Sequence, residues 1–574
     1  MGRPVFFHIG PDWCGEAGLA QLFRLNGHRA LLGCEADLAA DILMAEAQGS
    51  APLAAHAGVR LFAGLHRHAP HWRPPLEAWR SFAFLARSFP QARFILTTRA
   101  PEGWILDRLA RDKGAVARCH AHHRGLSEAD LPELWLADRQ AHLAAVEVFF
   151  GADPRLVRVD LDRETPADLA ARLSGLLPLP KTPQGRHWHP GGDEPAEQAL
   201  YAVLDRVREH DRPDPDYVRD VAGFCLRGAS AGAGEVAGLS GYACAWDGAG
   251  RVSDPQGRPR PMAIARQPGL GPTAVTRPDQ HFKILRAEGV VNDALRAGRP
   301  MPLLIDMEDS RWPGSEDGPA LPRPVIGHCR RAGARNMVLW PLPGQHDIGL
   351  PGFDPTAGPD PVPFEEKQDR LVWRGMISGS EMRETTRPGP ASHVFLRRLA
   401  EAGGDEAARR QAFEGLCRTS RMAFVRRFHD HPDFDVGIVM AWGFRDFARD
   451  PLLAPYCVPR RGPAFFRRFR YQLCLTGYDH GSNFIPMIDS RSVLLKEEDG
   501  WEVFYSGRFK PWKHYIPVAR YCADLPEKLA WARENPSECK RMSAAARAEC
   551  ARLRDPATRR AIHDAILDGL VRLR

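Results

Sequence analysis

Residues 475–483 form a glycine-rich segment between an apolar run and a helix-like sequence. A turn that leads from a strand into a helix presents backbone N–H groups to a phosphate. Asn483 is suited to the N-cap of that helix, and Pro486 is tolerated in its first turn. Arg374 and Arg383 add guanidinium groups, which make charge-assisted hydrogen bonds to phosphate oxygens. These residues predict a phosphate-binding site, with a plain tight turn as the alternative for the two glycines.

Four ordered segments in the second half of the chain carry a family resemblance. They are residues 305–309, 371–375, 477–483 and 510–518, with the sequences IDMED, LVWRG, GYDHGSN and KPWKHYIPV. In this order they resemble glycosyltransferase family 90, which includes protein O-glucosyltransferases and bacterial lipopolysaccharide glycosyltransferases. The resemblance covers residues 200–574. It implies a two-lobed GT-B enzyme that inverts the anomeric centre in one displacement, without a covalent intermediate.

The resemblance also assigns roles to residues. Asp309 takes the place of the catalytic base, which accepts the proton of the acceptor hydroxyl. Asp306 is the competing carboxylate, and we interpret it as a strand-edge or loop group. The implied substrate-binding residues are Trp373, Arg374, Gly375, Arg383, Gly477, Asp479, Ser482, Asn483, Lys496, Glu502 and His514. The implied co-substrate is a UDP-hexose, glucose or galactose, and no other cofactor is expected; dependence on a divalent metal is left open.

The sequence departs from part of the family at one position. Asn483 stands where the eukaryotic members have an arginine, and the surrounding pattern is that of the bacterial lipopolysaccharide branch. This favours a glycan or lipid-linked glycan over a protein as the acceptor. We therefore expect a cytoplasmic protein that associates peripherally with the inner face of the membrane through basic and aromatic surface.

The elements that position these residues alternate between strand and helix, the pattern of an α/β fold with parallel sheets. Ser127 and Asp130 form a capping-box pair before a helix that ends at Gly151, and Asp555 with Pro556 opens the last helix. The first of these helices has an expected apolar face of Leu136, Leu143, Val146 and Phe150. Apolar runs predict strands near residues 5–10, 92–99, 155–162, 303–307, 336–340, 371–373, 434–440, 471–475, 492–495 and 514–518.

The N-terminal region has a resemblance of its own. Residues 7–10, Gly15, residues 22–27 and a strand that ends at Arg99 resemble a sulfotransferase over residues 4–180. Arg99 matches that family's 3′-phosphate-binding arginine. Trp13 stands where the family has its donor-binding lysine, and Asp107 replaces a serine. The resemblance thus implies a P-loop-like α/β domain whose site, reduced to Gly15 and Arg99, is degenerate and which binds acceptor glycan or a partner.

These observations divide the chain into four expected segments. Residues 1–185 form the sulfotransferase-like domain, and residues 186–200, rich in proline, glycine and histidine, form a linker. Residues 201–365 form the acceptor-side lobe of the transferase. Residues 366–574 form the donor-side lobe and the C-terminal helices.

Composition narrows the functional classes. The 574 residues carry a net charge of +7, but the 78 lysines and arginines are dispersed among 71 acidic residues, so nucleic acid is not an expected partner. The 12 cysteines include no CxxC pair, which indicates free thiols in a reducing compartment. No apolar run is long enough for a transmembrane helix or a signal-peptide core.

Three histidine-containing stretches are candidates for metal sites: residues 66–71, 119–123 and 429–433. None has the paired ligand spacing of a structural zinc site, so no metal site is predicted. Two rival functions remain. The first is a bifunctional enzyme that also sulfates the glycan, which the missing lysine at position 13 opposes. The second is a sulfotransferase-like glycan-binding protein without activity, which the intact Asp309 opposes.

Overall fold

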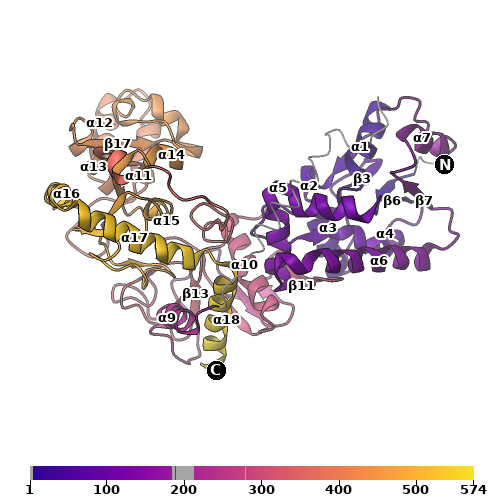
Figure 1. Ribbon diagram of the computed structural model, residues 1–574, viewed down its shortest axis with the longest axis horizontal. Helices are drawn as coiled ribbons and strands as arrows, with labels where there is room; N and C mark the ends of the chain where they lie inside the picture. The colour runs from indigo at the N-terminus through magenta and orange to yellow at the C-terminus, as the bar shows by residue number, and fades with distance from the viewer. Residues whose placement is uncertain (1–3, 184–187, 189–212, 278, 574) are drawn as a thin grey trace. The chain divides into compact units, whose positions relative to one another are not determined.

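The computed structural model describes residues 4–183, 188, 213–277 and 279–573 (Figure 1). The chain divides into two compact units. Unit 1 combines Met1–Asp211 with Gly241–Ile305, and unit 2 combines Arg212–Ser240 with Asp306–Arg574. The expected linker at 186–200 lies outside the described residues except for Trp188, which is buried in unit 1. The expected domain boundaries stay predictions.

Unit 1 is built on a parallel five-stranded sheet of order β2-β3-β1-β6-β7. Successive side chains of a strand point to opposite faces of the sheet, so neighbouring residues of β1 belong to different apolar clusters. Phe6 packs with α1, and Phe7 packs with α3. Figure 1 shows α1 and α7 on one side of the strands and α3, α4 and α6 on the other. The bounds are β1 Phe6–His8, α1 Glu16–Leu25, β2 Ala30–Leu32, α2 Gly33–Ala36, α3 Leu38–Gln48, β3 Leu61–Ala63, β4 His66–Arg67, β5 Leu76–Glu77, α4 Phe82–Ser88, β6 Arg93–Thr98, α5 Pro101–Arg124, α6 Leu131–Phe150, β7 Leu156–Asp160 and α7 Pro166–Leu173.

The later segment of unit 1 packs on this α/β core. A hairpin of β10 and β11 buries Ala263, Ala265 and Val275 in the same apolar cluster as α3. The buried Glu288 on α10 forms an ion pair of 2.9 Å with Arg73, which fixes the helix to the N-terminal part. The elements are β8 Cys244–Asp247, β9 Val252–Ser253, β10 Met262–Gln267, β11 Gly271–Thr276, α10 Phe282–Arg296 and β12 Pro302–Ile305.

The sequence located the opening of α6 and part of its apolar face, because Val146 and Phe150 are buried and Leu143 packs against the core. The capping box of Ser127 and Asp130 forms as predicted, although it opens a short 3-10 helix, Glu128–Asp130, that precedes α6. The buried face of α6 includes Trp135 and His142, whereas Leu136 is only partly buried. Burial of the Trp135 indole determines which face of α6 points toward the core. A hydrogen bond of 2.8 Å from His142 to the carbonyl of Ile9 holds the helix in this orientation.

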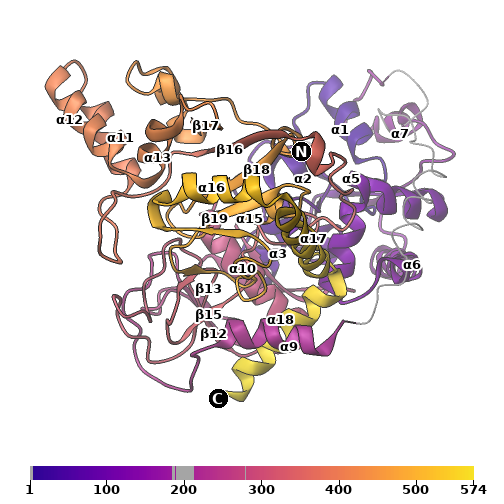
Figure 2. The ribbon, with the colours of Figure 1, turned by 60° about the vertical axis from the view of Figure 1, so that its left-hand side comes forward.

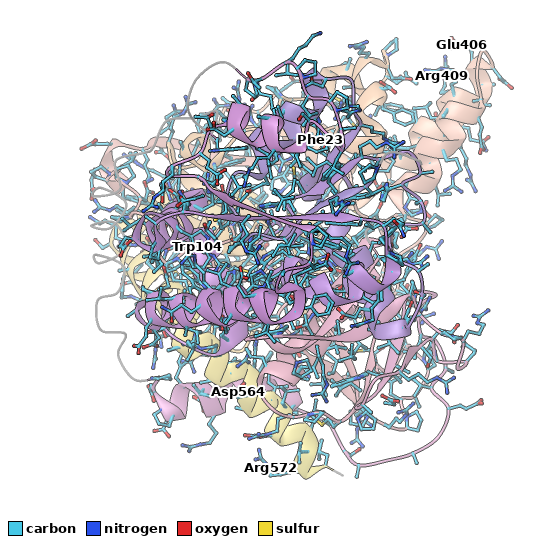
Figure 3. The ribbon with its side chains drawn as sticks, turned by 90° about the vertical axis from the view of Figure 1, so that its right-hand side faces the viewer. Phe23, Trp104, Glu406, Arg409, Asp564 and Arg572 are labelled. Carbon is cyan, nitrogen blue, oxygen red and sulfur yellow. The ribbon has the colours of Figure 1, made fainter. Side chains whose placement is uncertain are left out.

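Unit 2 contains a second parallel sheet of order β17-β16-β18-β19-β21. Its core lies between this sheet and the surrounding helices and includes Trp373, Leu473 and Leu495. Figure 2 shows α11, α12 and α13 gathered at the β17 side, and Glu406, labelled in Figure 3, lies exposed at the start of α12. The bounds are β16 Gln368–Met376, α11 Ser392–Glu401, α12 Glu406–Cys417, α13 Ser420–Phe428, β17 Phe434–Val439, α14 Pro463–Phe466, β18 Phe469–Cys474, α15 Phe484–Ile488, β19 Val493–Glu497, β21 Ile516–Val518, α16 Leu525–Glu534 and α17 Pro536–Leu553.

The rest of unit 2 surrounds two further parallel strands, β13 Val325–Gly327 and β15 Met337–Leu339. β14 Arg330–Arg331 pairs with β20 Trp501–Glu502. Helix α9 Pro215–Leu226 packs against α18 Pro556–Arg572, whose Asp555 cap accepts a bond from the N–H of Thr558 as predicted. Asp564 and Arg572 mark α18 in Figure 3.

The α/β class predicted from the sequence is confirmed, with parallel sheets of Rossmann-like kind in both units. The specific sulfotransferase-like and GT-B architectures stay predictions. In the described part of the chain, no helix is both long enough and apolar enough to cross a membrane.

Candidate functional site

A cavity of about 840 Å³ lies within unit 2, beside the carboxyl ends of β16, β17 and β18. Ligands of open parallel sheets bind at this edge, because the loops that follow the strands converge there. The cavity brings together most of the residues predicted from the four sequence segments. They are Asp309, Trp373, Arg374, Gly375, Gly477, Asp479, Ser482 and Asn483.

The lining of the cavity includes several cationic side chains. Arg374 lies within β16 near its carboxyl end, and its guanidinium carbon is 4.3 Å from the ring centroid of Phe465. The guanidinium also forms an ion pair of 2.7 Å with Asp435 on β17. Four further arginines line the cavity, although no sequence motif pointed to them. They are Arg421, Arg460, Arg461 and Arg467. Several guanidinium groups in a partly closed space favour a multiply charged anion.

Arg421 joins the ends of two strands. Its guanidinium donates to the carbonyls of Met376, Leu475 and Thr476, each at 3.0 Å. It also donates to the Ser378 hydroxyl at 2.5 Å. Burial lowers the pKa of Arg421, and nearby anionic groups offset part of that effect. The residue therefore shapes the cavity edge as well as adding charge to it.

The glycine-rich loop follows β18 as predicted. A Cβ at Gly481 would lie 2.6 Å from the Cys474 sulfur and 2.7 Å from the Leu475 carbonyl oxygen, so only glycine fits without movement. Asn483 occupies the N-cap of α15, but its side chain makes no capping bond. Instead the Asn483 amide donates to the carbonyl of Leu473 and its oxygen lies 3.2 Å from the Cys474 sulfur, which ties the loop to its own strand.

The two candidate carboxylates differ sharply. Asp306 is fully buried, accepts bonds from the N–H and hydroxyl of Ser240, and pairs with Arg311 at 3.0 Å. The Asp309 side chain lines the cavity and is 42% exposed. Of the two, Asp309 therefore has access to a substrate hydroxyl.

A histidine lies between Asp309 and a second cavity carboxylate. His328 Nε2 is 3.8 Å from Asp309 Oδ1 and 3.4 Å from Asp479 Oδ2. Burial by itself raises the pKa of Asp479, but the bond and charge of His328 and the N–H of Ser310 outweigh it, so this pKa lies below its usual value. Asp479 is thus held as an anion beside the imidazole.

Four predicted binding residues do not line the cavity. The Arg383 side chain is largely exposed, and its Nη2 lies 3.5 Å from Glu381 Oε2. Glu502 pairs with Arg330 and Arg227. The remaining two have local partners: Lys496 Nζ donates to the Glu497 carbonyl at 3.1 Å, and the buried His514 accepts from the N–H of Lys510 at 2.8 Å.

The residues expected to form a degenerate sulfotransferase site make contacts within unit 1. Gly15 adopts a φ of 86° before α1, and Arg99 forms an ion pair with Asp107. Asp12 is buried and pairs with Arg108 at 3.2 Å, while Trp13 stacks on His68. A negative charge in this loop opposes a phosphate group.

The chain resembles known glycosyltransferases over part of its length. Residues 464–550 match the family model of glycosyl transferase family 90. Protein O-glucosyltransferase 3 of Rattus norvegicus is 33% identical over 78 residues, which are 14% of this chain and 15% of the relative. The human protein O-glucosyltransferase 3 is 29% identical over 228 residues, 40% of this chain and 38% of the relative.

A bacterial relative matches as well. O-glucosyltransferase LpsA of Dichelobacter nodosus is 25% identical over 179 residues, 31% of this chain and 42% of the relative. The chain thus spans less than half the length of each of these relatives. The expected resemblance to glycosyltransferase family 90 is confirmed, carried by the segment that contains the glycine-rich loop.

Proposed function

We propose that unit 2 is an inverting glycosyltransferase that moves a hexose from a nucleotide sugar to a hydroxyl of a surface glycan. UDP-glucose and UDP-galactose are the favoured donors, and lipopolysaccharide is the favoured acceptor class. The observation that carries the proposal is the cavity in which the accessible carboxylate of Asp309 and five arginines occur together. The family resemblance and the names of the relatives add support.

The arrangement suits a single displacement. Asp309 accepts the proton of the acceptor hydroxyl while the hydroxyl oxygen forms its bond to the anomeric carbon. The bond between that carbon and the diphosphate oxygen breaks at the same time, and the electron pair leaves with the diphosphate. Arg374 and its neighbouring guanidinium groups stabilise the charge that develops on the leaving group, because they are held in place before the reaction begins.

The acceptor and the location follow from the same proposal. A lipid-linked glycan is built at a membrane surface, so we place the protein in the cytoplasm and at the inner face of the membrane. Binding would be peripheral, through basic and aromatic surface. Flotation with vesicles that contain anionic lipid measures this directly: co-migration at low salt that is lost at high salt supports it, and absence of co-migration opposes it.

The experiment that tests the proposed function is a panel of nucleotide sugars. Each is assayed for protein-dependent release of nucleoside diphosphate and for thermal stabilisation of the protein. A donor at about 100 times its dissociation constant stabilises the folded state by about 2.7 kcal/mol, which is a visible shift in the unfolding midpoint. If no nucleotide sugar is bound or consumed, the proposal is wrong, and an inactive binding protein becomes the favoured function.

A further inference from the structure

Three potential metal ligands of unit 2 come together beside the proposed base. Among the residues that the structure describes, His328, Cys329 and Asp479 form a group of metal-binding side chains whose ligand atoms all lie within 4.8 Å of one another. His328 and Cys329 directly follow β13, and Asp479 belongs to the loop after β18. Histidine nitrogen, thiolate sulfur and carboxylate oxygen are the ligands that zinc prefers.

The distances match a tetrahedral site. Zinc bonds of about 2.0–2.1 Å to nitrogen, about 2.0–2.2 Å to oxygen and about 2.3 Å to sulfur require about 3.4 Å between nitrogen and oxygen and about 3.6 Å between sulfur and oxygen. His328 Nε2 lies 3.4 Å from Asp479 Oδ2, and Cys329 Sγ lies 3.6 Å from the same oxygen. Two of the three edges of the ligand triangle therefore already have the lengths that zinc imposes.

The charges match as well. A thiolate and a carboxylate neutralise a divalent ion, and the imidazole adds a neutral ligand, so the loaded site carries no net charge in a buried place. Cys329 is fully buried and His328 is 4% exposed, whereas Asp479 reaches the cavity. We propose that His328, Cys329 and Asp479 bind one zinc ion, with the fourth coordination position open to the cavity next to Asp309.

Binding has a proton balance. Cysteine coordinates zinc as the thiolate, so a thiol at this position must lose its proton to become a ligand. Zinc displaces that proton as the Zn–S bond forms, which releases one proton into solution. Zinc affinity should therefore rise with pH.

The test uses the full chain, stripped of metal with a chelator and titrated with Co²⁺, which reports thiolate ligation by a sulfur-to-cobalt charge-transfer band. We expect one equivalent of Co²⁺, displacement by Zn²⁺ and loss of the band in Cys329→Ser. The matched control is Cys539→Ser, since Cys539 is equally buried in unit 2 but donates only to the Ala532 carbonyl. This control should keep the band.

A second variant guards against misfolding. Should Cys329→Ser not fold, Asp479→Asn is titrated instead, and its Zn²⁺ affinity should fall by at least about tenfold. A wild-type protein without the band, a Cys329→Ser protein that keeps it, or an Asp479→Asn protein with unchanged affinity overturns the proposal. None of these measurements uses a nucleotide sugar, so the zinc site and the proposed transferase can fail separately.

Discussion

Arg421 offers the sharpest test of how the cavity is held together. Replacement by methionine keeps an unbranched apolar stem beside Trp373, whose ring centroid lies 5.5 Å from the guanidinium carbon, but removes every donor. Three carbonyls at the ends of β16 and β18 then lose their guanidinium partner. Hydrogen bonds to a charged group contribute about 1.5–3 kcal/mol each, and partial access of water reduces the sum to about 3–5 kcal/mol of unfolding free energy.

The assay is thermal unfolding followed by circular dichroism. At roughly 2 °C per kcal/mol, Arg421→Met should lower the midpoint of unit 2 by about 6–10 °C. The matched control is Arg460→Met, which removes a guanidinium from the lining of the same cavity but leaves the strand ends with their Arg421 partner. It should leave the midpoint within about 2 °C of wild type and weaken only anion binding. Equal midpoints for the two variants would show that the bonds from Arg421 to the strand ends do not stabilise unit 2.

Three other residues give predictions that depend on packing and charge. Gly481→Ala should lower the free energy of unfolding by about 1–3 kcal/mol, because the new Cβ would lie 2.6 Å from the Cys474 sulfur. Burial lowers the pKa of His142 to about 3, so as the pH falls the unfolded chain takes up this proton before the folded protein does. Between pH 6.5 and pH 5 the wild type should therefore lose about 2 kcal/mol more free energy of unfolding than His142→Gln. Glu288→Gln should cost unit 1 about 3–5 kcal/mol, since it leaves the buried Arg73 without its carboxylate.

Each of these predictions has its own measurement. Urea unfolding reports the glycine variant, and a free energy equal to wild type would show that the loop relaxes at no cost. For the histidine, the free energy of unfolding is measured against pH for wild type and His142→Gln. Parallel curves across the pH window would contradict a lowered pKa of His142 in the folded protein. For the glutamate, proteolysis should expose the segment from 241 to 305 earlier than in wild type; an unchanged cleavage pattern contradicts the role of the ion pair.

Much of the cavity could be predicted because its parts follow buried strands. The apolar run at 371–373 gave β16, which extends to Gln368–Met376, and the run at 434–440 gave β17. The carboxyl ends of parallel strands meet at one edge, so the motif residues that follow them meet there too. Local sequence was sufficient for the segments at 305–309, 371–375 and 477–483, because each lies at or near the end of a strand.

The other parts depend on long-range pairing that local patterns do not encode. Arg421 is on α13, with no motif around it, yet its guanidinium reaches two strand ends. Glu502 has a suitable side chain for a hydrogen bond to a nucleotide sugar, but its carboxylate already forms an ion pair with Arg330 at 3.0 Å. The attachment of residues 241–305 to unit 1 rests on the packing of a hairpin on α3 and on the Glu288 ion pair.

We propose that Asp309 accepts the proton of the acceptor hydroxyl, and its replacement by asparagine removes that basic group while keeping the size of the side chain. Asp309→Asn is compared with wild type for transfer from the best nucleotide sugar and for binding of that donor, with Asp317→Asn, an exposed carboxylate nearby in sequence, as the control. We expect transfer reduced by at least about 100-fold in Asp309→Asn, nearly unchanged donor affinity, and wild-type activity in the control. Near wild-type turnover in Asp309→Asn would contradict it.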